Sequence, residues 1–172
     1  MGPMFEQRLN AINWGDFHTA YGPAVEVPGQ LRRLAGADRE AAMAATHDLW
    51  CGLCHQHVQV ASAATPALPF LLEVFDGADR DLTVELLDIL LGFALGVNWQ
   101  RVVEFQRSFG RETPTEERWS AELRARLLAE IPRFRQLAAS PDEDIADFAC
   151  RTLFELGATA DADPDAAIDS SL

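Results

Sequence analysis

The sequence contains no lysine. All 14 of its basic residues are arginine, and with 27 acidic residues the net charge is −13. Binding to nucleic acid through phosphate contacts requires clustered basic side chains, so this charge argues against a nucleic-acid partner. An acidic chain instead suits a basic protein partner, or stays soluble through its own charge. The composition therefore favours another protein as the partner.

Long apolar segments are also missing. No stretch approaches the roughly 18 uncharged apolar residues of a membrane-spanning helix, and the first residues lack the basic and apolar regions of a signal peptide. Three cysteines, an odd number in a chain without an export signal, favour reduced thiols. We therefore expect a cytoplasmic protein without membrane contact.

Motifs of common catalytic and cofactor sites are absent as well. The chain has neither the G-x-S-x-G motif of serine hydrolases nor a glycine-rich phosphate-binding loop. Pairs of carboxylates occur throughout so acidic a chain, so no single pair indicates catalysis. The sequence predicts no catalytic residue and no cofactor.

Helical periodicity is what the sequence does contain, and it is clearest in residues 65–95. Apolar residues of the first half recur at the spacing of one helix face, with Pro69 near the predicted start. Gly77 is a stop signal, and Asp79 follows as the cap of a second helix. The second helix carries two adjacent apolar stripes, so we expect it to be covered on two sides, at the middle of the molecule.

The same pattern occurs three times along the chain. A proline precedes a turn aspartate by ten residues in each copy: Pro28 and Asp38, Pro69 and Asp79, Pro132 and Asp142. The first two prolines are 41 residues apart, and the third follows after 63. A proline, an amphipathic segment and a polar cap are typical of a helix hairpin, and a period near 40 residues is typical of HEAT and armadillo solenoids.

A resemblance to a known group rests on further residues. Trp14, the segments 20–24 (AYGPA) and 27–28, and then His55-Gln56 and 67–71 (ALPFL) resemble bacterial HEAT-like repeat proteins. That group includes phycobilisome-lyase-type repeats, and the resemblance covers roughly residues 14–157. It is specific for the fold and says little about activity.

This resemblance implies an all-α fold, a right-handed α-α superhelix (solenoid) of about three HEAT-like helix hairpins with an N-terminal capping helix. A single domain is expected over residues 1–157, followed by an acidic C-terminal tail over 158–172. Within the domain the predicted repeat units span approximately residues 24–57, 58–96 and 114–157, with an irregular insert at 97–113. Residues 58–64 are predicted to form a bent helical lead-in to the second unit.

The insert at 97–113 is the most cationic stretch of the chain. A short helix is expected around Trp99, and residues 113–116 (TPTE) predict a capping box that starts the next helix. Long connections inside repeat arrays are often functional, and Trp, Phe and Arg dominate binding hot spots. The insert is therefore predicted either to contact a partner or to fold on its own aromatic rings. The candidate residues are Trp99, Arg101, Phe105, Arg107, Phe109 and Arg111.

A second candidate contact lies in the acidic C-terminal part. From residue 139 onward, nine acidic residues stand against one arginine. Such a charge would steer the encounter with a basic partner, so Asp142, Glu143 and Asp144 are predicted contacts. The acids of residues 38–40 and 79–81 are interpreted instead as helix caps and first-turn acids.

A cluster of cysteine and histidine resembles a metal site. Cys51, Cys54, His55 and His57 offer enough ligands for zinc, but one straight helix cannot surround a tetrahedral ion. The C-x-x-C-H spacing also matches haem attachment, which requires export, and a redox pair would need a strand-to-helix setting. We expect structural cysteines and no metal, with these four residues as the weaker alternative.

Two classes of function remain open. Stacked helix hairpins mostly bind other proteins, and concrete versions are an immunity protein that blocks a toxin and an adaptor. HEAT-like folds also include chromophore lyases, whose site would gather His18, Tyr21, His55 and His57. We favour a non-enzymatic protein-binding scaffold, a monomer or small homo-oligomer, over a lyase-type enzyme or a metal-binding module.

Overall fold

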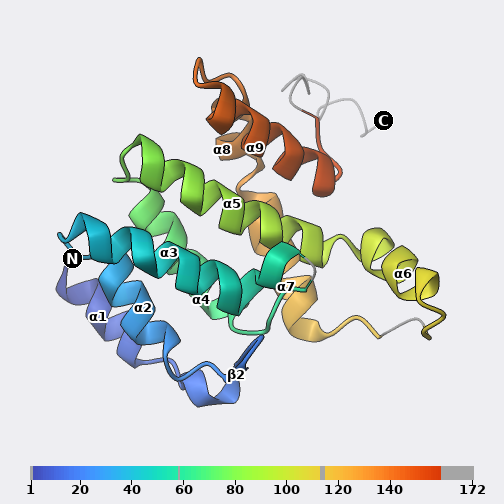
Figure 1. Ribbon diagram of the computed structural model, residues 1–172, viewed down its shortest axis with the longest axis horizontal. Coiled ribbons are helices and arrows are strands. Elements are labelled where there is room, and N and C mark those ends of the chain that lie inside the picture. Colours follow the sequence, from blue (N-terminus) through green and yellow to red (C-terminus); the bar gives the residue numbers. More distant parts are fainter. Residues whose placement is uncertain (1, 58, 113–114, 160–172) are drawn as a thin grey trace, which may run out of the picture.

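The computed structural model describes residues 2–57, 59–112 and 115–159, and these are mostly helical (Figure 1). The helices are α1 (Pro3–Asn10), α2 (Val27–Leu34), α3 (Arg39–Cys54), α4 (Ala64–Phe75), α5 (Arg80–Val97), α6 (Trp99–Ser108), α7 (Arg118–Ala129), α8 (Ile131–Ala138) and α9 (Glu143–Glu155), with 3₁₀ turns η1 (Trp14–Asp16) and η2 (His55–His57). Strands β1 (His18–Thr19) and β2 (Gly22–Pro23) form a small antiparallel ribbon in which His18 pairs with Pro23. The predicted all-α class is confirmed.

Three helix pairs share one construction: α2 with α3, α4 with α5, and α8 with α9. The first helix of each pair ends four residues before Asp38, Asp79 or Asp142, and that aspartate caps the second helix. The three carboxylates accept backbone N–H groups of the first turn at 3.0–3.3 Å, and such a cap contributes about 1 kcal/mol. Pro28 and Pro132 lie in the first turns of α2 and α8, as predicted.

Pro69, in contrast, does not lie at the start of its helix, and this prediction is wrong. α4 begins at Ala64 and continues through Pro69, whose missing N–H leaves the carbonyl of Thr65 without its helical donor. Arg126 of α7 donates to this carbonyl at 3.3 Å, and the Thr65 hydroxyl donates to the carbonyl of Trp119 at 3.0 Å. Because α7 supplies the missing hydrogen bond, the helix does not break at the proline.

α5 is the central element of the fold. It lies between α3 and α9 and also contacts α4, α6 and α7 (Figure 1). Burial of each large apolar side chain contributes about 1.5–3 kcal/mol, so this helix holds much of the core energy. The two predicted stripes are both buried, namely Leu82, Leu86, Leu87, Ile89, Leu90, Leu91, Phe93 and Ala94.

The N-terminal helix α1 packs on α4. Phe5 and Leu9 are buried, and the ring of Phe5 meets that of Phe70 edge-on with centroids 5.0 Å apart. Trp14 is buried too, and its indole N–H donates to the carbonyl of Leu9 at 3.0 Å. The predicted N-terminal helix is present, and Trp14 packs in the core whereas Tyr21 is exposed.

The insert at 97–113 is helical over most of its length, which corrects the predicted irregular segment. The side chain of Asn98 caps α6 by accepting the N–H of Arg101 at 3.3 Å, and its amide donates to Glu155 of α9 at 2.8 Å. The capping box predicted at 113–116 lies partly outside the described residues, and its described part is not helical. α7 begins only at residue 118.

Two further predicted segments differ from the structure or lie beyond it. The described residues 59–63 are not helical, in contrast to the predicted bent lead-in. The N–H of Ala61 donates to the carbonyl of Leu53 at 2.9 Å, and that of Ala63 to His18 at 3.0 Å, so these backbone groups are engaged outside a helix. The predicted acidic tail lies outside the described residues from residue 160 onward.

α6 projects from the body of the molecule (Figure 1). It is bent by 69° relative to α5, and it has no buried residue. Among the described residues no single helix is long and apolar enough to cross a membrane, and α5 and α6 pass that test only as a bent pair. The contact of Asn98 with α9 therefore holds the start of α6, while its later turns extend away.

Two glycines of α5 allow a close approach to the end of α3 and the segment that follows it. A Cβ on Gly92 would lie 2.6 Å from Sγ of Cys54 and 2.9 Å from Cδ2 of His57. A Cβ on Gly96 would lie 2.5 Å from Cβ of Val60. Glycine costs helix stability relative to alanine, but no side chain fits at these two positions.

We expect Gly92→Ala to lower the free energy of unfolding by about 1–3 kcal/mol, because the added methyl group overpacks the contact with Cys54. Gly29→Ala in α2 is the matched control, since an added Cβ meets nothing within 4 Å there. Because alanine has a higher helix propensity than glycine, Gly29→Ala is expected to raise the free energy of unfolding by up to about 1 kcal/mol. Urea unfolding followed by circular dichroism measures both, and equal effects of the two variants would contradict the close approach.

Candidate functional site

The residues that were predicted to contact a partner in the insert all lie on α6 or directly after it. They are Trp99, Arg101, Phe105 and Arg107 within the helix, then Phe109 and Arg111. Phe105 is 41% and Phe109 is 62% exposed, and their ring centroids are 4.9 Å apart. The guanidinium of Arg111 lies 5.8 Å from the centroid of the Phe109 ring. Phe105, Arg107, Phe109 and Arg111 are called the α6 surface below.

A cleft of about 820 Å³ lies beside this surface, between α6, the end of α5 and the start of α7. Its apolar wall includes Leu95, Trp99, Val102, Phe105 and Trp119. Volumes of roughly 300–1,000 Å³ are typical of binding pockets. Sequence reasoning identified the α6 side of this cleft but missed Leu95 and Trp119, because local periodicity assigns both only to helix faces.

The carboxylates of the cleft are engaged by their neighbours. Glu117 accepts the indole N–H of Trp119 at 2.7 Å, and Glu104 accepts the amide of Gln100 at 3.1 Å. Within the described part of the chain, neither carboxylate bonds a histidine. His57 also lines the cleft, and its carboxylate contact is with Asp88 rather than with either glutamate.

The predicted Cys/His cluster does not converge on one point. Nε2 of His57 lies 3.1 Å from the carboxylate of Asp88, whereas Nδ1 of His55 pairs with the hydroxyl of Tyr21 at 3.1 Å. In the described ranges no three His, Cys, Asp or Glu side chains are placed to hold a metal ion. Of the four groups predicted for a lyase-type site, Tyr21 and His55 thus pair with each other, whereas His57 contacts Asp88 and His18, in β1, takes part in neither contact.

Cys54 behaves as a core side chain. Burial is the main cause that raises the pKa of its thiol well above the ordinary value, and the nearby Asp88 and Cys51 add to it. Its Sγ donates to the carbonyl of Trp50 at 3.4 Å. Because the thiolate is the nucleophile and the metal ligand, a thiol held protonated is unreactive.

Alkylation of the native protein with a maleimide at pH 8 is expected to distinguish the three cysteines. Cys150 is exposed and should react first, Cys51 is half-buried and should react more slowly, and Cys54 should react only after unfolding. Mass spectrometry of digested samples measures the order. Labelling of native Cys54 as fast as Cys150 would contradict the burial of its thiol.

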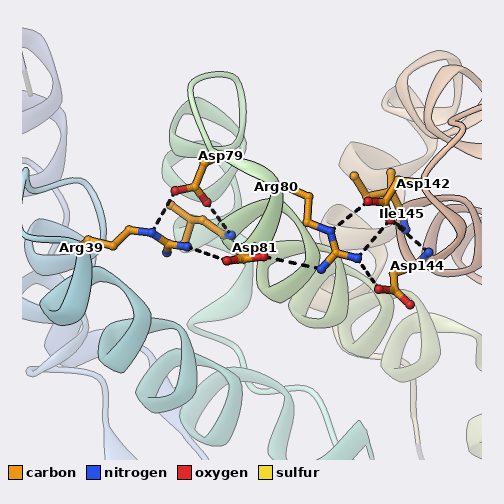
Figure 2. A network of polar contacts seen from close by, with 8 residues as sticks. Arg39, Asp79, Arg80, Asp81, Asp142, Asp144 and Ile145 are labelled. Carbon is orange, nitrogen blue, oxygen red and sulfur yellow. Dashed lines mark hydrogen bonds and ion pairs between the residues drawn. The ribbon is translucent and has the colours of Figure 1, made fainter.

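The second predicted contact group is bound within the chain. Nε of Arg80 lies 2.9 Å from Oδ2 of Asp142, and the same guanidinium also bonds Asp144 (Figure 2). Glu143, the first residue of α9, is exposed between them. Two of the three acids predicted to meet a partner are therefore occupied by Arg80.

The same arrangement occurs one helix pair earlier. Arg39, the first residue of α3, lies 2.9 Å from Asp79 and 3.2 Å from Asp81 at the start of α5 (Figure 2). In both cases the residue after one cap aspartate reaches the acids of the next pair. We call these contacts the arginine ladder. It ends at Glu143, which stands where Arg39 and Arg80 stand in the first two copies.

The ion pairs of the ladder shift the pKa values of Asp142 and Arg80. The hydrogen bond from Arg80 is the largest cause that lowers the pKa of Asp142, and backbone donors such as the N–H of Ile145 act in the same direction. The bond to Asp142 correspondingly raises the pKa of Arg80. Stability contributed by Asp142 is thus present above the ordinary aspartate pKa of about 3.9 and is lost as the pH falls through the lowered folded-state value.

We expect Arg80→Gln to lower the free energy of unfolding at pH 7. Its difference from wild type should shrink below about pH 4, where Asp142 of the unfolded chain begins to protonate while the folded chain keeps it ionised. Arg151→Gln, the control, removes a 3.5 Å pair with Asp147 inside α9 and should have a smaller effect, since such exposed pairs contribute little. Urea unfolding over a pH series measures this. A difference independent of pH would contradict the role of Asp142.

The two predicted contact groups lie at opposite ends of α5. Arg80, which holds Asp142, is the first residue of α5, and α6 follows its last residue, Val97. A helix of 18 residues is roughly 27 Å long. The α6 surface and the acids of α9 therefore do not form one site.

Comparisons of this chain with models of known protein families, with curated proteins and with solved structures found no match. The exposed α6 surface and the cleft beside it are the features of the molecule that bear on its function.

Proposed function

We propose that this chain is a non-enzymatic protein-binding scaffold, built from HEAT-like helix hairpins that stack as a right-handed superhelix. One observation supports it most: α6 keeps exposed aromatic side chains beside a cleft of about 820 Å³. Exposed aromatic and arginine side chains next to a cleft are typical of binding hot spots. The partner is another protein.

The exposure of α6 gives a physical reason for binding. A helix of ten residues is marginal on its own, and most helices gain their stability by packing an apolar face. α6 has no buried residue, so its exposed rings remain in water. Burying Phe105 and Phe109 under a partner would contribute about 1.5–3 kcal/mol each.

An immunity protein that blocks a toxin, or an adaptor, is the concrete form of this function, in a cytoplasmic monomer or small homo-oligomer. A lyase-type enzyme is less well supported, because Tyr21 and His55 pair with each other while His57 contacts Asp88. A metal-binding module is less well supported as well, because these contacts direct His55 and His57 to different partners.

Affinity purification from the native host tests the proposal with three forms of the full chain. Phe105→Asp/Phe109→Asp changes the α6 surface, and Phe154→Asp on α9 is the control, since Phe154 is 77% exposed elsewhere. We expect one protein to be retained in near-stoichiometric amount by the wild type and the control, and at least tenfold less by the double variant.

Circular dichroism and thermal unfolding show whether the double variant keeps its fold. Equal retention by all three forms would contradict the proposal, and so would a loss confined to Phe154→Asp. Retention of no protein by the wild type, at low salt as well as at physiological salt, would remove its support.

A further inference from the structure

We infer that the α6 surface recognises a protein segment in which large apolar side chains are flanked by carboxylates, although the whole chain carries a charge of −13. This inference rests on the proposed function and specifies the chemistry of the partner. It differs from the basic partner that the net charge favours.

The pairing of the arginines is the first observation. Acids outnumber arginines by 27 to 14, and most of the described arginines form an ion pair with a carboxylate. Arg107 and Arg111 form no ion pair among the described residues, and they flank the exposed Phe109. Arg118, Arg124 and Arg135 form none either, and it is the place of Arg107 and Arg111 on either side of the exposed Phe109 that lets them bind a carboxylate of a segment on the α6 surface.

The local charge is the second observation. Residues 99–112 contain three arginines and two glutamates, so this segment is net positive within an acidic chain. The acids of the ladder lie roughly 27 Å away, at the far end of α5. Exposed charges are largely screened beyond about 8 Å at physiological ionic strength. The ladder acids therefore do not set the charge at the α6 surface, where Arg107 and Arg111 act together with Glu104 and Glu117 of the adjoining cleft.

The geometry of Arg111 and the two rings is the third observation. The guanidinium carbon of Arg111 lies over the Phe109 ring within cation–π range, and N–H donors lie along the edge of the guanidinium plane. A carboxylate is the group that such an edge binds in a bidentate manner. Phe105 and Phe109 form one continuous apolar patch next to these donors.

The cleft supplies the apolar half of the recognition. Leu95, Val102 and Trp119 line it beside Phe105, so a large apolar side chain of the partner can enter while acidic neighbours meet the arginines. A basic segment would place its cations against Arg107 and Arg111, which is unfavourable at a desolvated interface. The surface thus selects for acidic flanks.

Two synthetic 12-residue peptides test the inference, with identical Phe and Leu positions and either Glu or Lys at the flanks. Fluorescence anisotropy with the full chain measures their affinity. We expect the Glu peptide to bind at least tenfold tighter than the Lys peptide, and Arg107→Glu/Arg111→Glu to abolish or reverse this preference. Arg124→Glu/Arg135→Glu is the matched control, because it changes the net charge equally on other helices and should retain the preference.

Several results would overturn the inference. They are tighter binding of the Lys peptide, no binding of either peptide, and an equal loss in both arginine double variants. If neither peptide binds while the Phe105/Phe109 variant still loses the native partner, the inference fails and the proposed function stands. If that variant keeps the native partner, the proposed function fails.

The chain itself is the remaining alternative occupant of the surface. A synthetic peptide of residues 158–172, which is acidic, serves as competitor, and sedimentation reports self-association. Displacement of the Glu peptide by this competitor, or a dimer that is lost in Arg107→Glu/Arg111→Glu, would assign the surface to the chain itself. Either result overturns the inference of a separate protein partner.

Discussion

The burial of α5 is the constraint on which the rest of the molecule depends. A helix with apolar side chains around most of its circumference is stable only when neighbours cover both flanks, and α3 and α9 do so. One helix pair cannot hide the apolar side of α5 by itself, so helices of the other two pairs cover it. Asn98 ends this most buried helix and caps the most exposed one, α6, so the position of α5 sets that of the candidate site.

Charge has different roles at the two ends of α5. At its start, the arginine ladder connects successive pairs and engages acids that, by composition alone, would be assigned to a partner. Beyond its end, Arg107 and Arg111 have no carboxylate within the described residues and stand beside exposed rings. The net charge of the chain is therefore a poor guide to its contact surface, because a bound segment meets only the charges nearest to it.

Prediction from sequence succeeded where a feature depends on neighbouring residues. Asp79 caps α5 because its carboxylate reaches an N–H three residues later. It failed at Pro69, because the donor that replaces the missing N–H belongs to Arg126, 61 residues from the carbonyl that accepts it. Prediction also underestimated the length of α6. The aromatic rings indicated a contact with a partner, but nothing in the sequence pattern indicated that the helix would extend to residue 108. The roles proposed for the α6 surface remain predictions.

Helix pairs, their caps and the burial of α5 could be read from the chain, because periodicity and capping act within one or two turns. Three features could not. The ion pair between Arg80 and Asp142 joins residues that are 62 positions apart. The cleft is lined by residues of α5, α6 and α7, which meet only in the folded chain. The exposure of α6 depends on the absence of a covering helix among the described residues. Each of these arises when packing brings together side chains that no local pattern connects.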